Sequence, residues 1–503
     1  MLNNRIKIKW IGLGLLTIAP AATLIQSQKT INKKPNVIFI LLDDYGYTDL
    51  CCYGSKFYET PNIDRLASEG IRFTDAYAAC PVSSPTRAAL MTGKYPVNTG
   101  VTDWIPGRQA STPGLPEDRF LSKPFNLQLD LKEITIAEAL KSNGYTTMIS
   151  GKWHLGEDSL YWPENQGFDV NKGGYSKGSP NKSNKSNGYF SPYGNPRLED
   201  GPVGEYLTDR QTDEAIKFIE DKKDKPFFVY LSYYAVHNPM QGKEELIKRF
   251  QAKADSMGLS DKQQFTKEKD WIRLAPKGDF KERIIQSYAV YAAMIYSVDE
   301  NLGRLFEKLR QLNIDNNTII IFTSDNGGLS TSEGSPTTNF PLRAGKGWLY
   351  EGGIRVPLII KAPGIIKKPA VTDVPVSTID YFPTILEMTG IPAGNIKTDG
   401  VSILPVLKSG KINNRPLFWH YPHYSNQGGD PGSAVRLGNY KLIDNFETGK
   451  QELYDLENDI SELNDISSTN PQKVTELYRL LDEWRNRNGA KMMNPNPNWN
   501  GSK

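Results

Sequence analysis

Short runs of apolar residues recur along most of this chain and are bounded by turn residues. Four of them are continuously apolar or β-branched, at residues 37–42, 146–150, 227–233 and 318–323. Continuous apolarity over so few residues is typical of strands that are buried on both faces. These runs therefore predict the strands of a mostly parallel, buried sheet.

Segments with helical periodicity lie between these runs. One begins at Pro61, and another covers residues 135–142, where the first residue and Glu138 form a predicted capping box. Residues 286–312 carry apolar side chains at intervals of three and four, which indicates a long amphipathic helix. Because strands and helices alternate over residues 35–400, we expect an α/β fold with a large mixed, mostly parallel sheet sandwiched by helices.

The pattern changes after Pro416. Short runs separated by turn residues predict an antiparallel sheet with strands at residues 417–420, 434–437, 440–444 and 452–455. Residues 471–486 have one apolar face and predict a helix packed on this small sheet. We therefore expect an α/β domain over residues 29–410, a smaller C-terminal α+β subdomain over 411–490 and a tail over 491–503.

The first 28 residues have the composition of a signal peptide. Three basic residues precede an apolar run at 10–18, and residues 19–21 (APA) supply a small-residue cleavage site. The run is too short to span a membrane, and no cysteine follows it that could carry a lipid anchor. We expect an exported protein, periplasmic or secreted, although a buried N-terminal helix is the alternative interpretation.

Charge and cysteine content limit the possible partners. The formal net charge of +3 falls to about zero without residues 1–28, which hold three basic and no acidic residues. No block of Lys and Arg with interleaved aromatic residues occurs, so the sequence predicts no nucleic-acid partner. Cys51, Cys52 and Cys80 leave at least one thiol unpaired. A disulfide from Cys80 to either neighbour and a buried free thiol both stay open.

Polar side chains follow the predicted strands. Asp43 and Asp44 follow the first run, His237 follows the third, and Asp325 and Asn326 follow the fourth. Open α/β sheets bind ligands beyond the carboxyl ends of their strands. Carboxylate and amide oxygens select Ca²⁺ or Mg²⁺ over zinc, so these residues predict one divalent cation. Turns and helix caps use the same residue types, which is the alternative interpretation.

Residues 80–94 place Ser83 directly before a predicted helix. Ser84 is expected to cap this helix, and Pro85 suits its first position. The free backbone N–H groups of the first turn, with Arg87 on the same turn, would then form a site for a tetrahedral anion. An ordinary capped helix is the alternative.

Residues 83–87 (SSPTR) and 90–94 (LMTGK) resemble the signature of the type I, formylglycine-dependent sulfatases of the alkaline phosphatase superfamily. Further segments match in the family's order: 41–46 (LLDDYG), 151–156 (GKWHLG), 235–239 (AVHNP), 323–328 (TSDNGG) and 342–357 (LRAGKGWLYEGGIRVP). The resemblance implies an alkaline phosphatase-like fold. Most members have Cys where this chain has Ser83, so it resembles the serine-type bacterial carbohydrate sulfatases. In those proteins a radical maturation enzyme converts the serine to formylglycine (3-oxoalanine).

The resemblance also implies a role for each residue of these motifs. The hydrated formylglycine at position 83 would attack sulfur, His237 would protonate the leaving alcohol, and His154 would be the base that expels sulfate. The sulfate oxygens would be held by the cation together with Arg87, Lys152 and Lys346. The ion would be Ca²⁺, with Mg²⁺ as the other choice, and its ligands would be Asp43, Asp44, Asp325, Asn326 and an oxygen of the matured Ser83.

Substrate contacts are expected near the C-terminal subdomain. In carbohydrate-acting sulfatases this region lines the leaving-group pocket, which makes substrate candidates of Asp103, Trp104, His423, Gln427 and Arg436. Packing between the domains is the alternative for each. The resemblance favours an exo-acting enzyme on galactose or N-acetylgalactosamine sulfates of glycans, without indicating which hydroxyl is sulfated.

Two other functions stay open at this point. With an unmodified Ser83 the chain would be a metal-dependent phosphatase or phosphodiesterase of the same superfamily. The two-zinc sites of those enzymes need further histidine ligands, and the chain has four histidines in all. A chain that is never matured would be a glycan-binding protein without catalytic activity, although every expected catalytic position is filled.

Overall fold

A mixed, mostly parallel sheet forms the centre of the computed structural model, which describes residues 34–109, 114–180, 182–266 and 281–501. Its strand order is β12-β2-β11-β10-β1-β9-β5-β6, and within this described sheet only β11 runs against its neighbours. The predicted sheet is confirmed. The strands are β1 (Asn36–Leu42), β2 (Ile71–Phe73), β5 (Thr146–Gly151), β6 (Val170–Lys172), β9 (Phe227–Ser232), β10 (Thr318–Ser324), β11 (Leu358–Lys361) and β12 (Ala370–Thr372).

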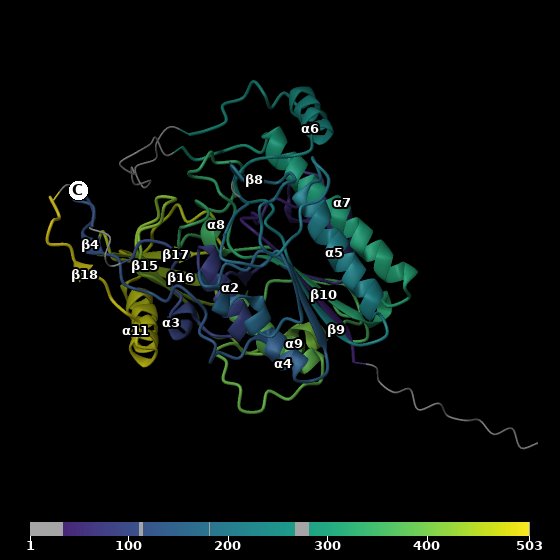
Figure 1. Cartoon of the computed structure of the whole chain (residues 1–503). Coiled ribbons are helices and arrows are strands. Elements are labelled where there is room, and N and C mark those ends of the chain that lie inside the picture. The colour runs from purple at the N-terminus through teal and green to yellow at the C-terminus, as the bar shows by residue number, and fades with distance from the viewer. Residues whose placement is uncertain (1–33, 110–113, 181, 267–280, 502–503) are drawn as a thin grey trace, which may run out of the picture. The chain divides into compact units, whose positions relative to one another are not determined.

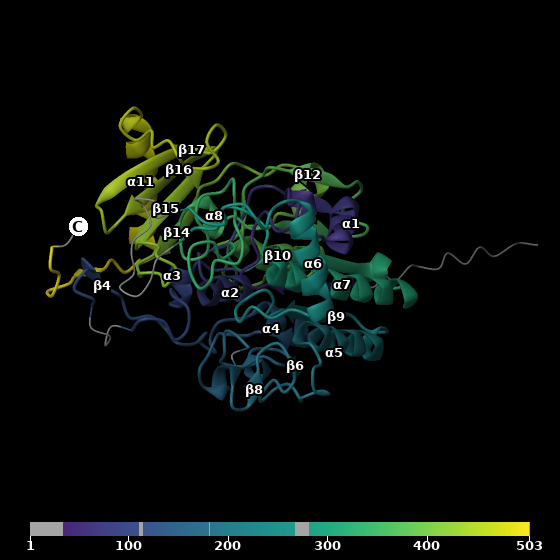
Figure 2. The same ribbon diagram turned by 90° about the horizontal axis from the view of Figure 1, so that it is seen from above.

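Helices cover both faces of this sheet (Figures 1 and 2). Alternate residues of β1 point to opposite faces, as the pleat of a strand requires, and enter two different apolar cores. One core contains residues of α1 (Pro61–Glu69), α5 (Leu207–Lys222) and α7 (Ala289–Gln311). The other contains residues of α2 (Ser83–Thr92), α4 (Ile136–Lys141) and α9 (Tyr381–Met388). The predicted arrangement of a sheet between helices is therefore confirmed.

The predicted elements match the observed ones within a few residues, with one exception that bears on the site. The capping box of α4 is present, with Glu138 N donating to Thr135 Oγ1 at 3.1 Å. The predictions that Ser84 caps α2 and that Pro85 is its first residue are wrong, because α2 begins at Ser83, Val82 is its N-cap residue and Pro85 is its third residue. Ser84 Oγ instead accepts a hydrogen bond from Ile105 N at 3.1 Å. The Ser84 side chain therefore makes a tertiary contact instead of the helix cap that the local sequence pattern predicted.

A second, antiparallel sheet follows, formed by β14 (Leu417–Tyr421), β15 (Gly432–Leu437), β16 (Tyr440–Asn445) and β17 (Lys450–Asp455). Helix α11 (Pro471–Arg487) packs on it through Leu477, Leu481 and Trp484. This sheet and helix confirm the expected C-terminal architecture. The predicted border at residue 410 lies between α10 (Leu404–Ser409) and β14, and the domain limits themselves stay predictions.

The remaining described elements are short, except helix α6 (Glu244–Ser256), which has 13 residues. Lys34 onward forms one compact unit, and the predicted signal peptide at residues 1–28 lies outside the described residues. Cys51, Cys52 and Cys80 are free thiols, and none of the described helices is long and apolar enough to cross a membrane. The short elements are η1 (Cys51–Tyr53), β3 (Ala76–Tyr77), α3 (Pro96–Thr99), β4 (Phe120–Leu121), η2 (Ser159–Tyr161), η3 (Pro163–Asn165), β7 (Lys182–Ser183), β8 (Ser186–Asn187), η4 (Asp315–Asn317), α8 (Glu351–Ile354), β13 (Val376–Ser377), η5 (Thr378–Asp380) and β18 (Asn494–Pro495).

Candidate active site

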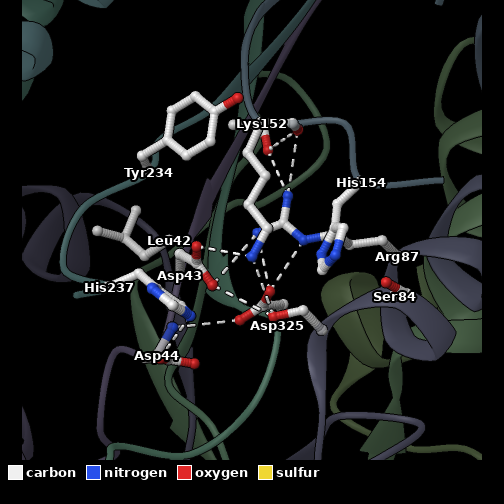
Figure 3. A network of polar contacts seen from close by, with 12 residues as sticks. Leu42, Asp43, Asp44, Ser84, Arg87, Lys152, His154, Tyr234, His237 and Asp325 are labelled. Atoms are coloured by element: carbon white, nitrogen blue, oxygen red, sulfur yellow. Dashed lines mark hydrogen bonds and ion pairs between the residues drawn. The ribbon is translucent and has the colours of Figure 1, made fainter. Parts of the chain in front are cut away.

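The carboxyl ends of four adjacent strands, β10, β1, β9 and β5, bring the predicted site residues together. Parallel strands end at the same edge of a sheet, so the segments that follow them share that edge. Figure 3 shows the polar network that results. The residues that these segments contribute are Asp43, Asp44, Lys152, His154, His237, Asp325 and Asn326.

Five oxygen-bearing side chains meet at the start of α2. Ser83 Oγ lies 3.3 Å from Asp43 Oδ1 and 3.4 Å from Asn326 Oδ1. Asn326 Nδ2 donates to Asp44 Oδ1 at 2.8 Å, and the backbone N–H of Asp44 donates to Asp325 Oδ1 at 3.2 Å. All five residues are buried. The structure thus brings together the complete set of predicted metal ligands.

This donor set suits a hard divalent cation. Burial raises the pKa of Asp43, and the nearby carboxylates of Asp325 and Asp44 raise it further, against the effect of Lys152. A cation between these oxygens would relieve their mutual repulsion. Asp43 and Asp44 also offer ligand atoms within 4.8 Å of a ring nitrogen of His237. The described residues therefore form a possible metal site, and His237 is a ligand candidate that the sequence did not suggest.

Two lysines line the same cavity as Ser83. Lys152 Nζ lies 2.8 Å from Asp43 Oδ2 and 3.2 Å from Ser83 Oγ. Lys346 Nζ lies 2.8 Å from Asp44 Oδ2. Burial lowers the pKa of Lys152, whereas for Lys346 burial is outweighed by the carboxylates of Asp44, Glu333 and Asp43 together, which hold the pKa above its ordinary value. Paired ammonium groups at this position are suited to hold the oxygens of an anion.

Arg87 lies deeper than these lysines. Its Nε donates to Asp325 Oδ2 at 2.9 Å, and its Nη1 donates to Ser232 Oγ at 2.7 Å and to the Lys152 carbonyl at 3.2 Å. The side chain is fully buried and is absent from the lining of the cavity described below, itself built from described residues. Arg87 therefore positions Asp325 and the end of β5, and its contact with sulfate oxygens stays a prediction.

The hydrogen bonds of the two site histidines define which nitrogen of each can exchange a proton. His237 Nδ1 donates to the Asn238 carbonyl at 3.0 Å, so Nε2 is the atom that faces Lys346, at 3.2 Å. His154 Nε2 donates to the Ile105 carbonyl at 2.5 Å, which leaves Nδ1 as the acceptor. No hydrogen-bond partner for that Nδ1 occurs among the described residues. Burial, with the charge of Lys152, lowers the pKa of His154 well below its ordinary value.

These residues open into a cavity of about 390 Å³. Its volume is in the range of small-ligand sites in proteins. Its lining includes the side chains of the chemical site, Ser83, Lys152, His154, His237 and Lys346. The other polar or aromatic side chains of the lining are Trp104, Glu157, Ser176, Lys177, Ser179, Glu333, Asn426 and Gln427.

Comparison with known proteins identifies the family of this site. Residues 35–391 match the family model described as Sulfatase, and residues 344–487 match the model described as N-sulphoglucosamine sulphohydrolase, C-terminal. The chain belongs to the sulfatase family. This sulfatase has the alkaline phosphatase-like fold and is a sulfuric ester hydrolase, as the sequence motifs predicted.

Three relatives illustrate how far the likeness extends. This sulfatase is 32% identical to a protein named Sulfatase from Formosa agariphila, over 94% of this chain and 93% of that one. It is 30% identical to human N-acetylgalactosamine-6-sulfatase, over 81% of this chain and 71% of the human protein. The crystal structure of Ps i-CgsB in complex with k-i-k-neocarrahexaose matches it with a TM-score of 0.72 and 30% identity, covering 93% and 95% of the two chains.

The five predicted substrate residues of the sulfatase do not lie together. Trp104 and Gln427 line the cavity. Asp103 and His423 are buried outside the lining, where Asp103 Oδ1 accepts from Tyr421 OH at 2.9 Å and His423 Nε2 lies 2.9 Å from Thr102 Oγ1. Arg436 lies elsewhere, with Nη2 2.5 Å from Asp75 Oδ2. The structure thus brings two of the five to the cavity.

Sequence reasoning missed six polar residues of the cavity wall, namely Glu157, Ser176, Lys177, Ser179, Glu333 and Asn426. None has periodicity or forms part of a quoted motif, and Lys177 falls in a stretch rich in Gly, Ser and Asn. The available signal was position alone, since Glu333 follows the motif at residues 323–328 and Asn426 precedes Gln427.

Proposed function

We propose that this sulfatase removes sulfate from sugars one terminal unit at a time, with galactose or N-acetylgalactosamine sulfates of glycans as substrates. The observation that carries the proposal is the position of Ser83 Oγ, between the Lys152 ammonium and the Asp43 and Asn326 oxygens on the wall of a cavity. The sugars named for two similar proteins, N-acetylgalactosamine for the human sulfatase and neocarrahexaose in the Ps i-CgsB complex, support this substrate class. A cavity of about 390 Å³ supports action on a terminal sugar.

The proposal includes conversion of Ser83 to formylglycine by a maturation enzyme, and a bound Ca²⁺ or Mg²⁺. The hydrated aldehyde would supply the attacking oxygen, and the cation would stabilise negative charge on it and on the sulfate. The residues that would hold the ion are Asp43, Asp44, Asp325 and Asn326, with the oxygen of the matured side chain. The oxygen-only character of this set supports Ca²⁺ or Mg²⁺ over zinc.

Side chains of the protein itself bind the sulfate group and transfer protons. Lys152 and Lys346 bind the sulfate oxygens and stabilise the charge that develops on them. His237 Nε2 donates a proton to the bridging oxygen as the alcohol leaves. His154 Nδ1 accepts a proton on the Ser83 side of the cavity, while its Nε2 stays bonded to the Ile105 carbonyl.

We further propose that residues 1–28 direct export to the periplasm or the medium. The basic residues, apolar run and small-residue site at residues 19–21 support this part of the proposal.

The test uses protein isolated from its own host. We expect mass spectrometry of the Ser83 peptide to show the loss of two hydrogens, and the protein to release sulfate from a panel of sulfated sugars. Ser83→Ala should abolish turnover while leaving the circular dichroism spectrum and Tm unchanged, because the residue serves attack and not packing. An active protein with an untouched serine would overturn the proposal, and so would metal-dependent release of phosphate without release of sulfate. An intact serine with sugar affinity but no turnover would indicate a glycan-binding protein.

A further inference from the structure

The wall of the active-site cavity carries a carboxylate outside the sulfatase motifs. Glu333 lines the cavity together with His237, Lys346 and Gln427, and its side chain is exposed. Its Oε1 accepts a hydrogen bond from Gln427 Nε2 at 2.5 Å, and its Oε2 accepts one from Asn238 Nδ2 at 3.2 Å. Glu333 therefore bridges the residue that follows His237 and the C-terminal segment that contributes Gln427.

The loop around Glu333 fixes this position. Glu333, Gly334 and Ser335 have φ angles of +53°, +90° and +40°, which is the left-handed region that Glu and Ser seldom adopt. Ser335 N donates to the Ser332 carbonyl at 2.8 Å, and Arg283 Nε donates to the Ser335 carbonyl at 2.6 Å. A sparsely populated backbone conformation persists only where its surroundings hold it, and it is common at ligand sites.

The hydrogen bonds around Glu333 also define what this part of the cavity can recognise. Ser425 Oγ donates to Gln427 Oε1 at 2.7 Å, so the Gln427 amide is oriented with its nitrogen toward Glu333. What Glu333 offers a ligand is therefore its unused carboxylate lone pairs and a negative charge. Glu333 lines the same cavity as Lys346 and Ser83, and its negative charge helps to raise the pKa of Lys346, so it faces the space proposed for the sulfate. A hydroxyl group can donate to this carboxylate, whereas a second anionic group would be repelled by it.

We infer that Glu333 is a specificity-determining residue, which accepts hydrogen bonds from hydroxyl groups of the sugar and repels a second anionic group on that side. The inference rests on the proposed function and adds a substrate class to it. Sugars with free hydroxyls beside the cleaved sulfate are preferred over sugars that carry a neighbouring sulfate or carboxylate there.

The test compares the wild-type protein and Glu333→Gln, both produced in the native host, on a matched pair of substrates. One is a monosulfated sugar, and the other is the same sugar with a second sulfate on the neighbouring hydroxyl. We expect kcat/KM of the wild type to favour the first by at least ~10-fold, and the preference to fall to ~3-fold or less in the variant, because Gln lacks the charge that repels the second sulfate. High salt should narrow the preference of the wild type more than that of the variant.

Two further variants make the result specific to this carboxylate. Glu220→Gln removes an exposed carboxylate of α5 that pairs with Lys308 at 2.7 Å, and it should leave the preference unchanged. Glu333→Asp keeps the charge and should keep the discrimination against the second sulfate, even where it weakens binding of the monosulfated sugar. An unchanged preference in Glu333→Gln, or its loss in Glu333→Asp, would overturn the inference. A wild type that releases sulfate from neither sugar would instead overturn the proposed function.

Discussion

At the scale of single residues, His237 is distinguished by a ring nitrogen that points into the cavity while the other is bonded to the backbone. We expect His237→Ala to lower kcat for alkyl sugar sulfates by ~10²-fold or more, because a sugar alcohol leaves poorly without a proton. Aryl sulfates have a better leaving group and should lose far less. Parallel assays of a sugar sulfate and a nitrophenyl sulfate measure the difference. Equal losses on both substrates would contradict the acid role and favour a role of His237 as a metal ligand.

Gly178 is a second residue whose effect can be tested singly. A Cβ atom at this position would lie 2.5 Å from His154 Cε1, so the imidazole would have to move and its bond to the Ile105 carbonyl would weaken. We expect Gly178→Ala to lower kcat by ~10-fold or more with little change in Tm, because displacing a catalytic group by a fraction of an ångström disturbs near-attack geometry. Steady-state kinetics and thermal melts give the two readings. Full activity would show that His154 tolerates displacement and is not the base.

At the scale of elements, the segment that contains Trp104 also contains the buried carboxyl group of Asp103, whose ionisation should affect the free energy of unfolding. Burial raises the pKa of Asp103 from its ordinary 3.8 to about 7. The folded protein then binds more protons than the unfolded chain between about pH 4 and pH 7, so the free energy of unfolding falls as the pH rises through this window. The shift of about three pH units corresponds to on the order of 4 kcal/mol.

Asp103→Asn should remove this pH dependence. Both hydrogen bonds to Asp103, from Trp104 N and Tyr421 OH, reach Oδ1, which an Asn side chain can supply equally. We expect the variant to match the wild type in unfolding free energy near pH 4.5 and to exceed it above pH 7. Urea unfolding at pH 4.5, 6 and 8 measures the difference. A difference between the two proteins that is the same at all three values would show that Asp103 is ionised in the folded state throughout.

The elements also show which parts of the fold and of the site could be predicted from the sequence. The central strands β1, β9 and β10 were predictable because each contains five or six consecutive apolar or β-branched residues. Strands β2 and β12 have three residues each, and β12 is largely exposed, so neither has a pattern to detect. The motifs indicated the residues predicted as metal ligands and both histidines of the site. The position of Glu333 depends instead on a loop conformation and on partners from two distant segments, which no local pattern encodes.

At the scale of the whole molecule, a buried cluster of charges joins the C-terminal antiparallel sheet to α8 and to the segment that follows β2. Lys441 Nζ of β16 lies 3.0 Å from Glu351 Oε1 and 2.9 Å from Glu462 Oε1, and all three side chains are fully buried. Positive and negative charges are equal in number, so each buried charge has an opposite partner. Arg436 is a member of this cluster, which explains why its guanidinium pairs with Asp75 and does not line the sugar cavity. The six members are Asp75, Glu351, Arg355, Arg436, Lys441 and Glu462.

Removing the Lys441 charge alone should lower the free energy of unfolding more than removing the charges of Lys441 and Glu462 together. Lys441→Met leaves Glu351 and Glu462 buried side by side, and we expect it to lower the unfolding free energy by about 3–5 kcal/mol, since an uncompensated buried charge is strongly destabilising. Combining it with Glu462→Gln should restore part of the loss, because Glu351 keeps Arg355 at 3.1 Å and the amide oxygen can still accept from Glu351 N. Urea unfolding of the two single variants, the double variant and the wild type gives the coupling energy. A double variant that is less stable than Lys441→Met would show that Glu462 carries no unpaired charge in the single variant.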